Sequence, residues 1–211
     1  MEKPFLNDIK LYVIIDMKLI SEADFSAVDI MRAAFRGGAR MFQLRHKGVG
    51  ERVLFYEAQE LSQVAHELGA LFIVNDSVSV ALSTGADGVH LGENDLPIHA
   101  ARKICPDDFI IGASAGSLER ALQAEKEGAS YVGYGAIFHT TTKEKPCPGS
   151  LDELGKINKV LKVPVFAIGG INEENVVEVT RVGVKRICVA SAVIKSENPE
   201  LTAKKLLEAL A

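Results

Sequence analysis

The sequence contains few cysteines, and their spacing suggests no pairing. Only three occur among 211 residues, Cys105, Cys147 and Cys188, and none belongs to a CxxC motif. An odd, scattered set argues against a disulfide framework and suits a reducing compartment, so we expect a cytoplasmic protein. The N-terminal segment MEKPFLNDIK has no apolar h-region, and we therefore expect no signal peptide.

Long apolar runs and basic runs are also absent from the sequence. No stretch approaches the ~18–20 apolar residues that a membrane-spanning helix needs, so we expect no membrane partner. The net charge of −4 is accompanied by no lysine-rich or arginine-rich run, which argues against a nucleic-acid partner. Any anionic ligand must therefore meet a local group of positive side chains. The composition leaves the oligomeric state open, a homo-oligomer included.

The sequence does have a strict alternation of apolar and amphipathic segments. Eight apolar segments rich in Val, Ile and Phe are typical of buried parallel strands. They cover Leu11–Asp16, Met41–Arg45, Leu71–Asp76, Gly88–Leu91, Ile110–Ser114, Tyr131–Ile137, Pro164–Gly169 and Arg186–Val193. Helical patterns lie between them, at Ser26–Gly37, Glu51–Leu68, Leu118–Glu127, Glu173–Val182 and Pro199–Leu210. This order predicts an α/β protein, a single (β/α)8 TIM barrel over residues 1–211, and an open doubly wound sheet is the alternative.

Polar side chains follow the second predicted strand at every other position. Gln43, Arg45 and Lys47 share one face of an extended chain, and Phe42 and Leu44 take the other face, toward the helices. Two cations and an amide are costly to desolvate without a ligand or a counter-charge. We interpret them as an anion site at the barrel mouth, because arginine binds phosphate through two parallel hydrogen bonds. An internal ion pair to a barrel carboxylate is the alternative.

Carboxylates follow the third and fourth predicted strands. Asn75 and Asp76 end LFIVND, and Asp95 lies in GVHLGEND. Adjacent parallel strands bring these groups to one rim, where two carboxylates facing a diphosphate predict Mg²⁺. The alternatives are helix caps, for which Asp76 is well placed before Ser77, or ion pairs with Arg45 and Lys47.

Small residues follow the last two predicted strands. The pairs Gly169-Gly170 and Ala190-Ser191 stand where barrels commonly bind a monophosphate through backbone N–H groups, although a tight turn also needs glycine. Ser114 ends the fifth strand, and by itself a serine there is more typical of a helix cap. His46, His90 and His139 have no metal-ligand spacing, so we interpret them as structural histidines.

The longest predicted loop, Phe138–Ser150, carries Thr140, Thr141, Thr142 and Lys143. Three hydroxyls and an ammonium group could hold an anion and close over it, and a solvated loop without a role is the alternative.

These segments together resemble the thiamine-phosphate synthase family over nearly the whole chain. The resemblance is carried by QLRHK (43–47), VND (74–76), GVHLGENDLP (88–97), IGAS (111–114), YGAIFHTTTK (134–143), AIGGIN (167–172) and VASAV (189–193), which follow the family's order and spacing. It implies a transferase that joins an aminopyrimidine diphosphate to a hydroxyethylthiazole phosphate, giving thiamine monophosphate and pyrophosphate.

The resemblance also implies a role for each matching residue. Arg45, Lys47, Lys143 and Ser114 would form the catalytic set, and Mg²⁺ would bind Asp76 and Asp95. The pyrimidine diphosphate would contact the segment Gln43, Leu44, Arg45, His46 and Lys47, together with Asn75, Ser114 and Lys143. The thiazole phosphate would contact Thr140, Thr141, Thr142, Gly170, Ala190 and Ser191. His46, Gly116, Ala136, His139 and Ala190 depart from residues common in the family.

Three other functions remain open at this point. A thiazole tautomerase, the family's paralogue, would be expected to lack much of the diphosphate and metal set and to use a histidine after the fifth strand, where this chain has Gly116. A sugar-phosphate epimerase or isomerase would need an acid–base pair across the barrel. A non-catalytic protein that binds thiamine precursors would not need the complete set of lysines and carboxylates.

Overall fold

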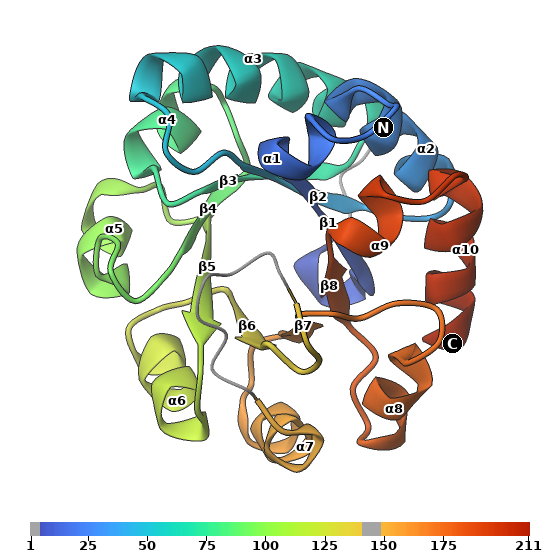
Figure 1. The fold of residues 1–211 in the computed structure, drawn as a ribbon. Helices are drawn as coiled ribbons and strands as arrows, with labels where there is room; N and C mark the ends of the chain where they lie inside the picture. Colours follow the sequence, from blue (N-terminus) through green and yellow to red (C-terminus); the bar gives the residue numbers. More distant parts are fainter. Residues whose placement is uncertain (1–4, 141–148) are drawn as a thin grey trace.

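A computed structural model describes residues 5–140 and 149–211. Its parallel strands form a closed barrel in which each strand pairs with its sequence neighbours and β8 returns to β1. Figure 1 views the barrel with the helices arranged around the strands. The strands are β1 (Leu11–Asp16), β2 (Met41–Arg45), β3 (Leu71–Asn75), β4 (Gly88–Leu91), β5 (Ile110–Ala115), β6 (Tyr131–Gly135), β7 (Val165–Ile168) and β8 (Ile187–Val189). The predicted (β/α)8 TIM barrel is therefore confirmed, and the open sheet is excluded.

The helices begin and end where local side chains favour it. Ser26 and Asp29 form a reciprocal capping box at the start of α2, and Gly69 ends α3 in the left-handed conformation that glycine adopts readily. The helices are η1 (Leu6–Asp8), α1 (Met17–Ile20), α2 (Ala27–Arg36), α3 (Glu51–Leu68), α4 (Val78–Ser83), α5 (Ile98–Ile104), α6 (Leu118–Lys126), α7 (Leu151–Val160), α8 (Val176–Arg181), α9 (Ser191–Ile194) and α10 (Pro199–Ala209). None of these described helices is long and apolar enough to cross a membrane.

Two predicted strands extend two or more residues past the end of the observed ones. The prediction extended the eighth strand to Val193, but β8 ends at Val189 because Ser191 begins the short helix α9. Similarly, β6 ends at Gly135 rather than Ile137. In both places an apolar run continues past the last strand residue, so hydrophobicity alone cannot mark the end of the strand.

Alternate residues of each strand face the barrel axis or the helices. One buried cluster fills the barrel, and it includes Tyr12, Ile14, Met41, Ile73, Tyr131, Phe166 and Cys188. A larger cluster lies between the strands and the helices, and it includes Val13, Phe42, Leu44, Val74 and Val89. Leu44 thus packs toward the helices, as its position in the alternation predicts. Gln43 and Arg45 take the opposite face, toward the barrel mouth.

Candidate active site

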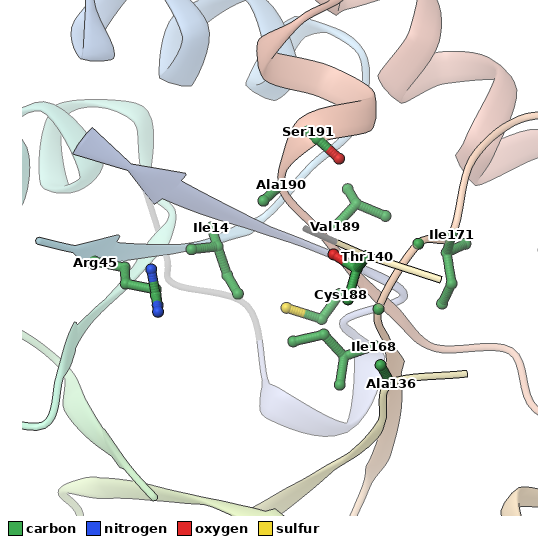
Figure 2. A pocket seen from close by; sticks show the side chains of 12 residues that line it. Ile14, Arg45, Ala136, Thr140, Ile168, Ile171, Cys188, Val189, Ala190 and Ser191 are labelled. Atoms are coloured by element: carbon green, nitrogen blue, oxygen red, sulfur yellow. The ribbon is translucent and has the colours of Figure 1, made fainter. Parts of the chain in front are cut away.

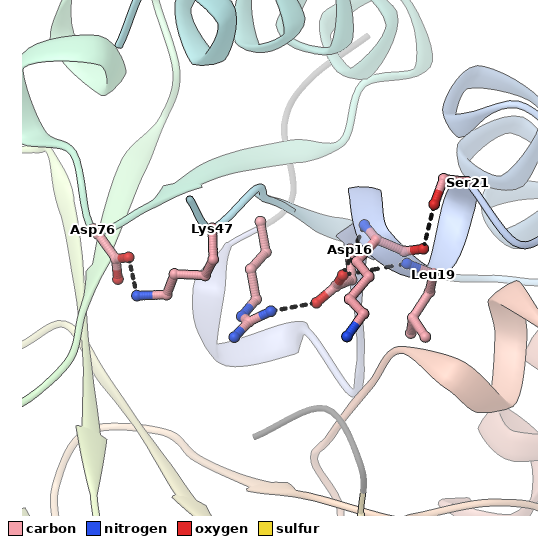
Figure 3. Close-up of polar contacts among 7 residues, drawn as sticks. Asp16, Leu19, Ser21, Lys47 and Asp76 are labelled. Atoms are coloured by element: carbon pink, nitrogen blue, oxygen red, sulfur yellow. Dashed lines mark hydrogen bonds and ion pairs between the residues drawn. The ribbon is translucent and has the colours of Figure 1, made fainter. Parts of the chain in front are cut away.

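The mouth of the barrel contains an ion pair between the ends of the first two strands. Asp16 and Arg45 are register partners in β1 and β2, and Arg45 Nη1 lies 2.5 Å from Asp16 Oδ2. Asp16 is only 2% exposed, and its other oxygen accepts hydrogen bonds from the backbone N–H groups of Lys18 and Leu19 (Figure 3). The carboxylate therefore caps α1 and holds the guanidinium in place. A guanidinium has five N–H donors, so Arg45 keeps donors that can meet an anion.

A second ion pair joins the ends of β2 and β3. Lys47 donates to the carboxylate of Asp76 (Figure 3). Burial raises the pKa of Asp76 and the neighbouring Asp95 carboxyl raises it further, whereas Lys47 opposes both effects. Asp95 accepts a hydrogen bond from the backbone N–H of Gly92 at 2.7 Å. Of the ion pairs that the sequence offered as alternatives, Lys47–Asp76 is present, and Arg45 has the internal ion pair to a barrel carboxylate, which is Asp16 and not Asp76 or Asp95.

These groups line one cavity at the ends of strands β2 to β6. Its volume is about 1010 Å³ including space open to solvent, and its walls include Arg45, Lys47, Asn75, Asp76, Asp95 and Ser114. The structure thus brings together most of the described residues predicted to bind a diphosphate and a metal; the exceptions are the deeper Gln43, and Leu44 and His46, which do not line this cavity. Gln43 is 2% exposed and lies in a smaller cavity directly beneath, which Arg45, Asn75 and Ser114 also line.

The donor set around Asp76 and Asp95 fits Mg²⁺ better than a transition metal. Among the described residues, no group of three or more His, Cys, Asp and Glu side chains could hold a metal ion. Mg²⁺ commonly takes only one or two protein carboxylates and completes its octahedron with water and substrate phosphate oxygens. Asp76 and Asp95, which both line the larger cavity, would supply those carboxylates.

A second cavity lies beside the first, at the ends of strands β6 to β8. Figure 2 shows its walls, which include Arg45, Thr140, Ala190 and Ser191. Gly169 and Gly170 complete the wall with positive φ angles of 100° and 65°. A Cβ on Gly170 would lie 2.4 Å from the carbonyl oxygen of His139, so only glycine fits there. With about 560 Å³ this cavity is the smaller of the two, and Arg45 lines both.

Ser114 and Asp76 are not helix caps. Ser117 caps α6, and Ser77 caps α4 through a bond to the backbone N–H of Val80. Ser114 Oγ instead lies 3.0 Å from His90 Nε2. His90 is hydrogen-bonded, as expected of a structural histidine, but it also lines the larger cavity, and sequence reasoning missed its link to Ser114.

Two residues of the predicted substrate segment lie away from the cavities. Leu44 is fully buried in the cluster between strands and helices, so its side chain does not reach the mouth. Any substrate contact of Leu44 would therefore come from its backbone, because strand alternation turns its side chain toward the helices. His46 Nδ1 lies 2.8 Å from a carboxylate oxygen of Glu57 on α3 and lines none of the described cavities. Thr141, Thr142 and Lys143 lie outside the described residues.

Sequence reasoning also missed Asp16. It ends β1 on the same face as Tyr12 and Ile14, which point into the barrel. The period-two argument applied to Gln43, Arg45 and Lys47 would have found it, because a carboxylate in that series needs a cation nearby.

The closed barrel places the chain among the (β/α)8 proteins, whose active sites lie at the carboxyl ends of the strands. A family model described as thiamine monophosphate synthase matches residues 11–193. The thiamine-phosphate synthase of Pyrococcus furiosus is 46% identical over 200 residues, which cover 95% of this chain and 94% of that protein. The chain belongs to the thiamine monophosphate synthase family, a family of transferases.

Further comparisons agree with this assignment. The thiamine-phosphate synthase of Chlorobium phaeovibrioides is 45% identical, with 90% of this chain and 91% of that protein covered. A solved structure of the Pyrococcus furiosus thiamine phosphate pyrophosphorylase superposes with a TM-score of 0.86 at 43% identity, covering 97% of this chain and 96% of that one. The family and the transferase class expected from the sequence are confirmed.

Proposed function

We propose that the chain condenses an aminopyrimidine diphosphate with a hydroxyethylthiazole phosphate, releasing thiamine monophosphate and pyrophosphate. One observation carries the proposal: two anion cavities adjoin at the barrel mouth, one with cations and paired carboxylates, the other with a glycine wall. Two phosphorylated substrates held side by side match this arrangement. The proposed substrates follow from family membership and from these cavities together.

The diphosphate is assigned to the larger cavity. Arg45 and Lys47 would meet its oxygens, and Gln43, Asn75 and Ser114 would orient the pyrimidine. Asp76 and Asp95 would hold Mg²⁺, which when bound supplies positive charge against the diphosphate oxygens. Lys143, Thr141 and Thr142 remain predictions from the sequence. His46 would act through the backbone of its segment, because its side chain contacts Glu57.

The monophosphate is assigned to the smaller cavity. Gly170 removes the side chain that would block a close approach to the backbone, and Thr140 and Ser191 offer hydroxyl groups. Ala190 adds a small apolar wall. This placement leaves the thiazole ring directed toward the larger cavity, where its nitrogen can reach the pyrimidine.

The reaction needs positioning and charge stabilisation more than a protein nucleophile. The C–O bond of the pyrimidine diphosphate breaks, and its electron pair leaves with pyrophosphate, whose growing charge Arg45 and Lys47 would stabilise. The aminopyrimidine would stabilise the resulting benzylic-type cation. The lone pair of the thiazole nitrogen then forms the new C–N bond. Holding both substrates in line supplies the remaining rate enhancement.

A cytoplasmic location is part of the proposal. It is supported by Cys105, a buried cysteine that forms no disulfide with any described residue. Free thiols are typical of reducing compartments.

A turnover assay with both purified substrates tests the function. We expect thiamine monophosphate and pyrophosphate in equal amounts, and no product when either substrate is omitted. Tautomerisation of a thiazole phosphate without the pyrimidine substrate would instead identify the paralogous activity. Tight binding of both compounds without product would identify a sensor.

A further inference from the structure

A chain of hydrogen bonds runs through the inside of the barrel to Ser114. Gln43 Nε2 donates to the hydroxyl of Tyr12. The hydroxyl oxygens of Tyr12 and Tyr131 lie 2.9 Å apart, and Tyr131 Oη lies 3.0 Å from His90 Nδ1. His90 Nε2 then lies 3.0 Å from Ser114 Oγ, which lines the larger cavity. These hydrogen bonds therefore join residues of five strands, β1, β2, β4, β5 and β6, and end at the mouth of the barrel.

The two tyrosines are held rigidly. Tyr12 is 1% exposed and Tyr131 is fully buried. Phe166 packs edge-on against both rings, with centroids 5.6 and 5.5 Å away. A Cβ on Gly112 would lie 2.2 Å from the Tyr131 ring, so the glycine of IGAS makes room for that ring. Burial raises the pKa of both hydroxyls well above their usual value, and both keep their protons.

The side-chain amide of Gln43 sets the donor-to-acceptor direction of this series of hydrogen bonds. An amide nitrogen can only donate, so the Tyr12 oxygen accepts from Gln43. The direction that also gives the Tyr12 proton an acceptor among these groups is donation to Tyr131. Tyr131 then donates to His90 Nδ1, which must lack a proton. The single proton of a neutral imidazole therefore sits on Nε2 and is donated to Ser114 Oγ. The hydroxyl proton of Ser114 is left to point into the cavity.

We propose that Tyr131 and His90 are positioning residues that make Ser114 a hydrogen-bond donor to the pyrimidine diphosphate. The proposal rests on the proposed function for its substrate, but the tautomer of His90 is a property of the protein alone. His90 acts here as a neutral connector between a buried hydroxyl and a substrate-facing hydroxyl. It does not exchange protons with the substrate.

Nitrogen-15 NMR of histidine-labelled protein without substrate reads the tautomer directly. We expect His90, assigned by the signal that the His90→Gln variant lacks, to be neutral with its proton on Nε2. In Tyr131→Phe the donor to Nδ1 is lost, and we expect a mixture of tautomers. A proton on Nδ1 in the unaltered protein would mean that the chain runs in the opposite direction, and this would overturn the proposal.

Steady-state kinetics test whether the hydrogen bonds from Tyr131 and His90 affect catalysis through Ser114. We expect Tyr131→Phe to lower kcat/KM for the pyrimidine diphosphate by roughly 10-fold, the size of one well-placed hydrogen bond, with the thiazole phosphate KM unchanged. In a Ser114→Ala background the same substitution should cause no further loss, because residues acting in one chain are not additive. Ile73→Val, which removes a methyl group from the same inner cluster but no hydroxyl, is the control and should leave both constants unchanged.

The loss caused by Tyr131→Phe in the two backgrounds decides between a role through Ser114 and a general structural role. An equal loss in both backgrounds would show that Tyr131 supports the barrel in general, and the proposal would fall. If Tyr131→Phe does not fold, Tyr12→Phe interrupts the chain one step earlier and should give a smaller loss that also vanishes with Ser114→Ala. If the unaltered protein turns over no substrate, the proposed function fails, whereas the tautomer measurement still decides the hydrogen-bond direction.

Discussion

Asp16 and Arg45 face each other across β1 and β2, and the carboxylate that holds the guanidinium also caps α1. Arg45 is therefore fixed at the barrel mouth before any ligand arrives. Removing one partner of such an ion pair destabilises the folded protein, because a charge near the interior without a counter-charge raises its free energy.

Asp16→Asn should lower the stability of the protein, because it leaves the charge of Arg45 without its partner. Asparagine keeps an oxygen for the backbone N–H groups of α1 but removes the charge beside Arg45, and we expect a loss of about 2 kcal/mol in the free energy of unfolding. Added pyrophosphate should raise the Tm of this variant more than that of the unaltered protein, because the anion replaces the missing charge. Glu67→Gln, which breaks the exposed pair with Arg32, is the control and should change stability little. An equal or smaller Tm rise would contradict this role for Asp16.

Asp76→Asn should raise the Mg²⁺ requirement. The variant keeps the shape of the side chain but removes one of two carboxylates from the larger cavity. We expect the Mg²⁺ concentration for half-maximal turnover to rise by about 10-fold or more, because the variant has fewer charged ligands. Asp107→Asn, an exposed carboxylate on the loop after α5, is the control. Full turnover of the unaltered protein in excess chelator would remove the metal from the proposal.

Gly170→Ala should weaken binding of the thiazole phosphate, and comparison with Gly183→Ala should distinguish this effect from backbone strain. A side chain at φ 65° costs about 1–2 kcal/mol, and here its Cβ would also press on the carbonyl of His139. We expect the KM for the thiazole phosphate to rise on the order of 10-fold, because the phosphate is displaced. Gly183→Ala has a φ of 85° and open space around its Cβ, so it should lose stability without a change in KM. A similar KM change in both variants would show that only general strain is at work.

Glu153→Gln should destabilise the protein in a pH-dependent way. The backbone N–H of Leu118 and the hydroxyl of Tyr134 donate to Glu153, and these bonds lower the pKa of its carboxyl. A lowered folded pKa means stability that is present above the unfolded value of about 4.3 and is lost as pH falls through the folded value.

At pH 7 we therefore expect Glu153→Gln to cost about 1 kcal/mol or less, and the difference should shrink as the pH falls below the unfolded pKa of about 4.3. Urea unfolding of both proteins across this range measures it. Asp152→Asn removes a carboxylate from the same helical turn and is the control. A difference that stays constant down to pH 3 would contradict the assignment to the charged form.

The barrel could be predicted from the sequence because its local patterns, the apolar segments and the alternation within strands, agree with the observed fold. Each of the eight apolar segments overlaps an observed strand, and the face of Gln43 and Arg45 follows from strand alternation. Strand ends were less certain at β6 and β8, where apolar residues continue into a loop or a helix. Leu44 was assigned to the substrate with its whole segment, although alternation alone would have excluded its side chain.

Contacts that exist only after closure of the barrel could not be read from sequence spacing. Tyr12 and Tyr131 are 119 positions apart, yet their hydroxyls lie 2.9 Å from each other. Neither residue has a motif that marks it as polar and functional, because a buried tyrosine in a strand is usually a packing residue. His90 looked structural for the same reason, since its partners lie on β5 and β6.

Arg45 forms part of the wall of both cavities at the barrel mouth. In the proposed function both cavities bind an anion, and one guanidinium shared between them would make the two binding equilibria thermodynamically linked. Whichever anion binds first changes the free energy of binding of the second, and reciprocity requires the reverse effect to be equal in size. Because two anions compete for one positive charge, that contribution to the coupling is antagonistic. The same antagonism favours departure of one anionic product while the other is still bound.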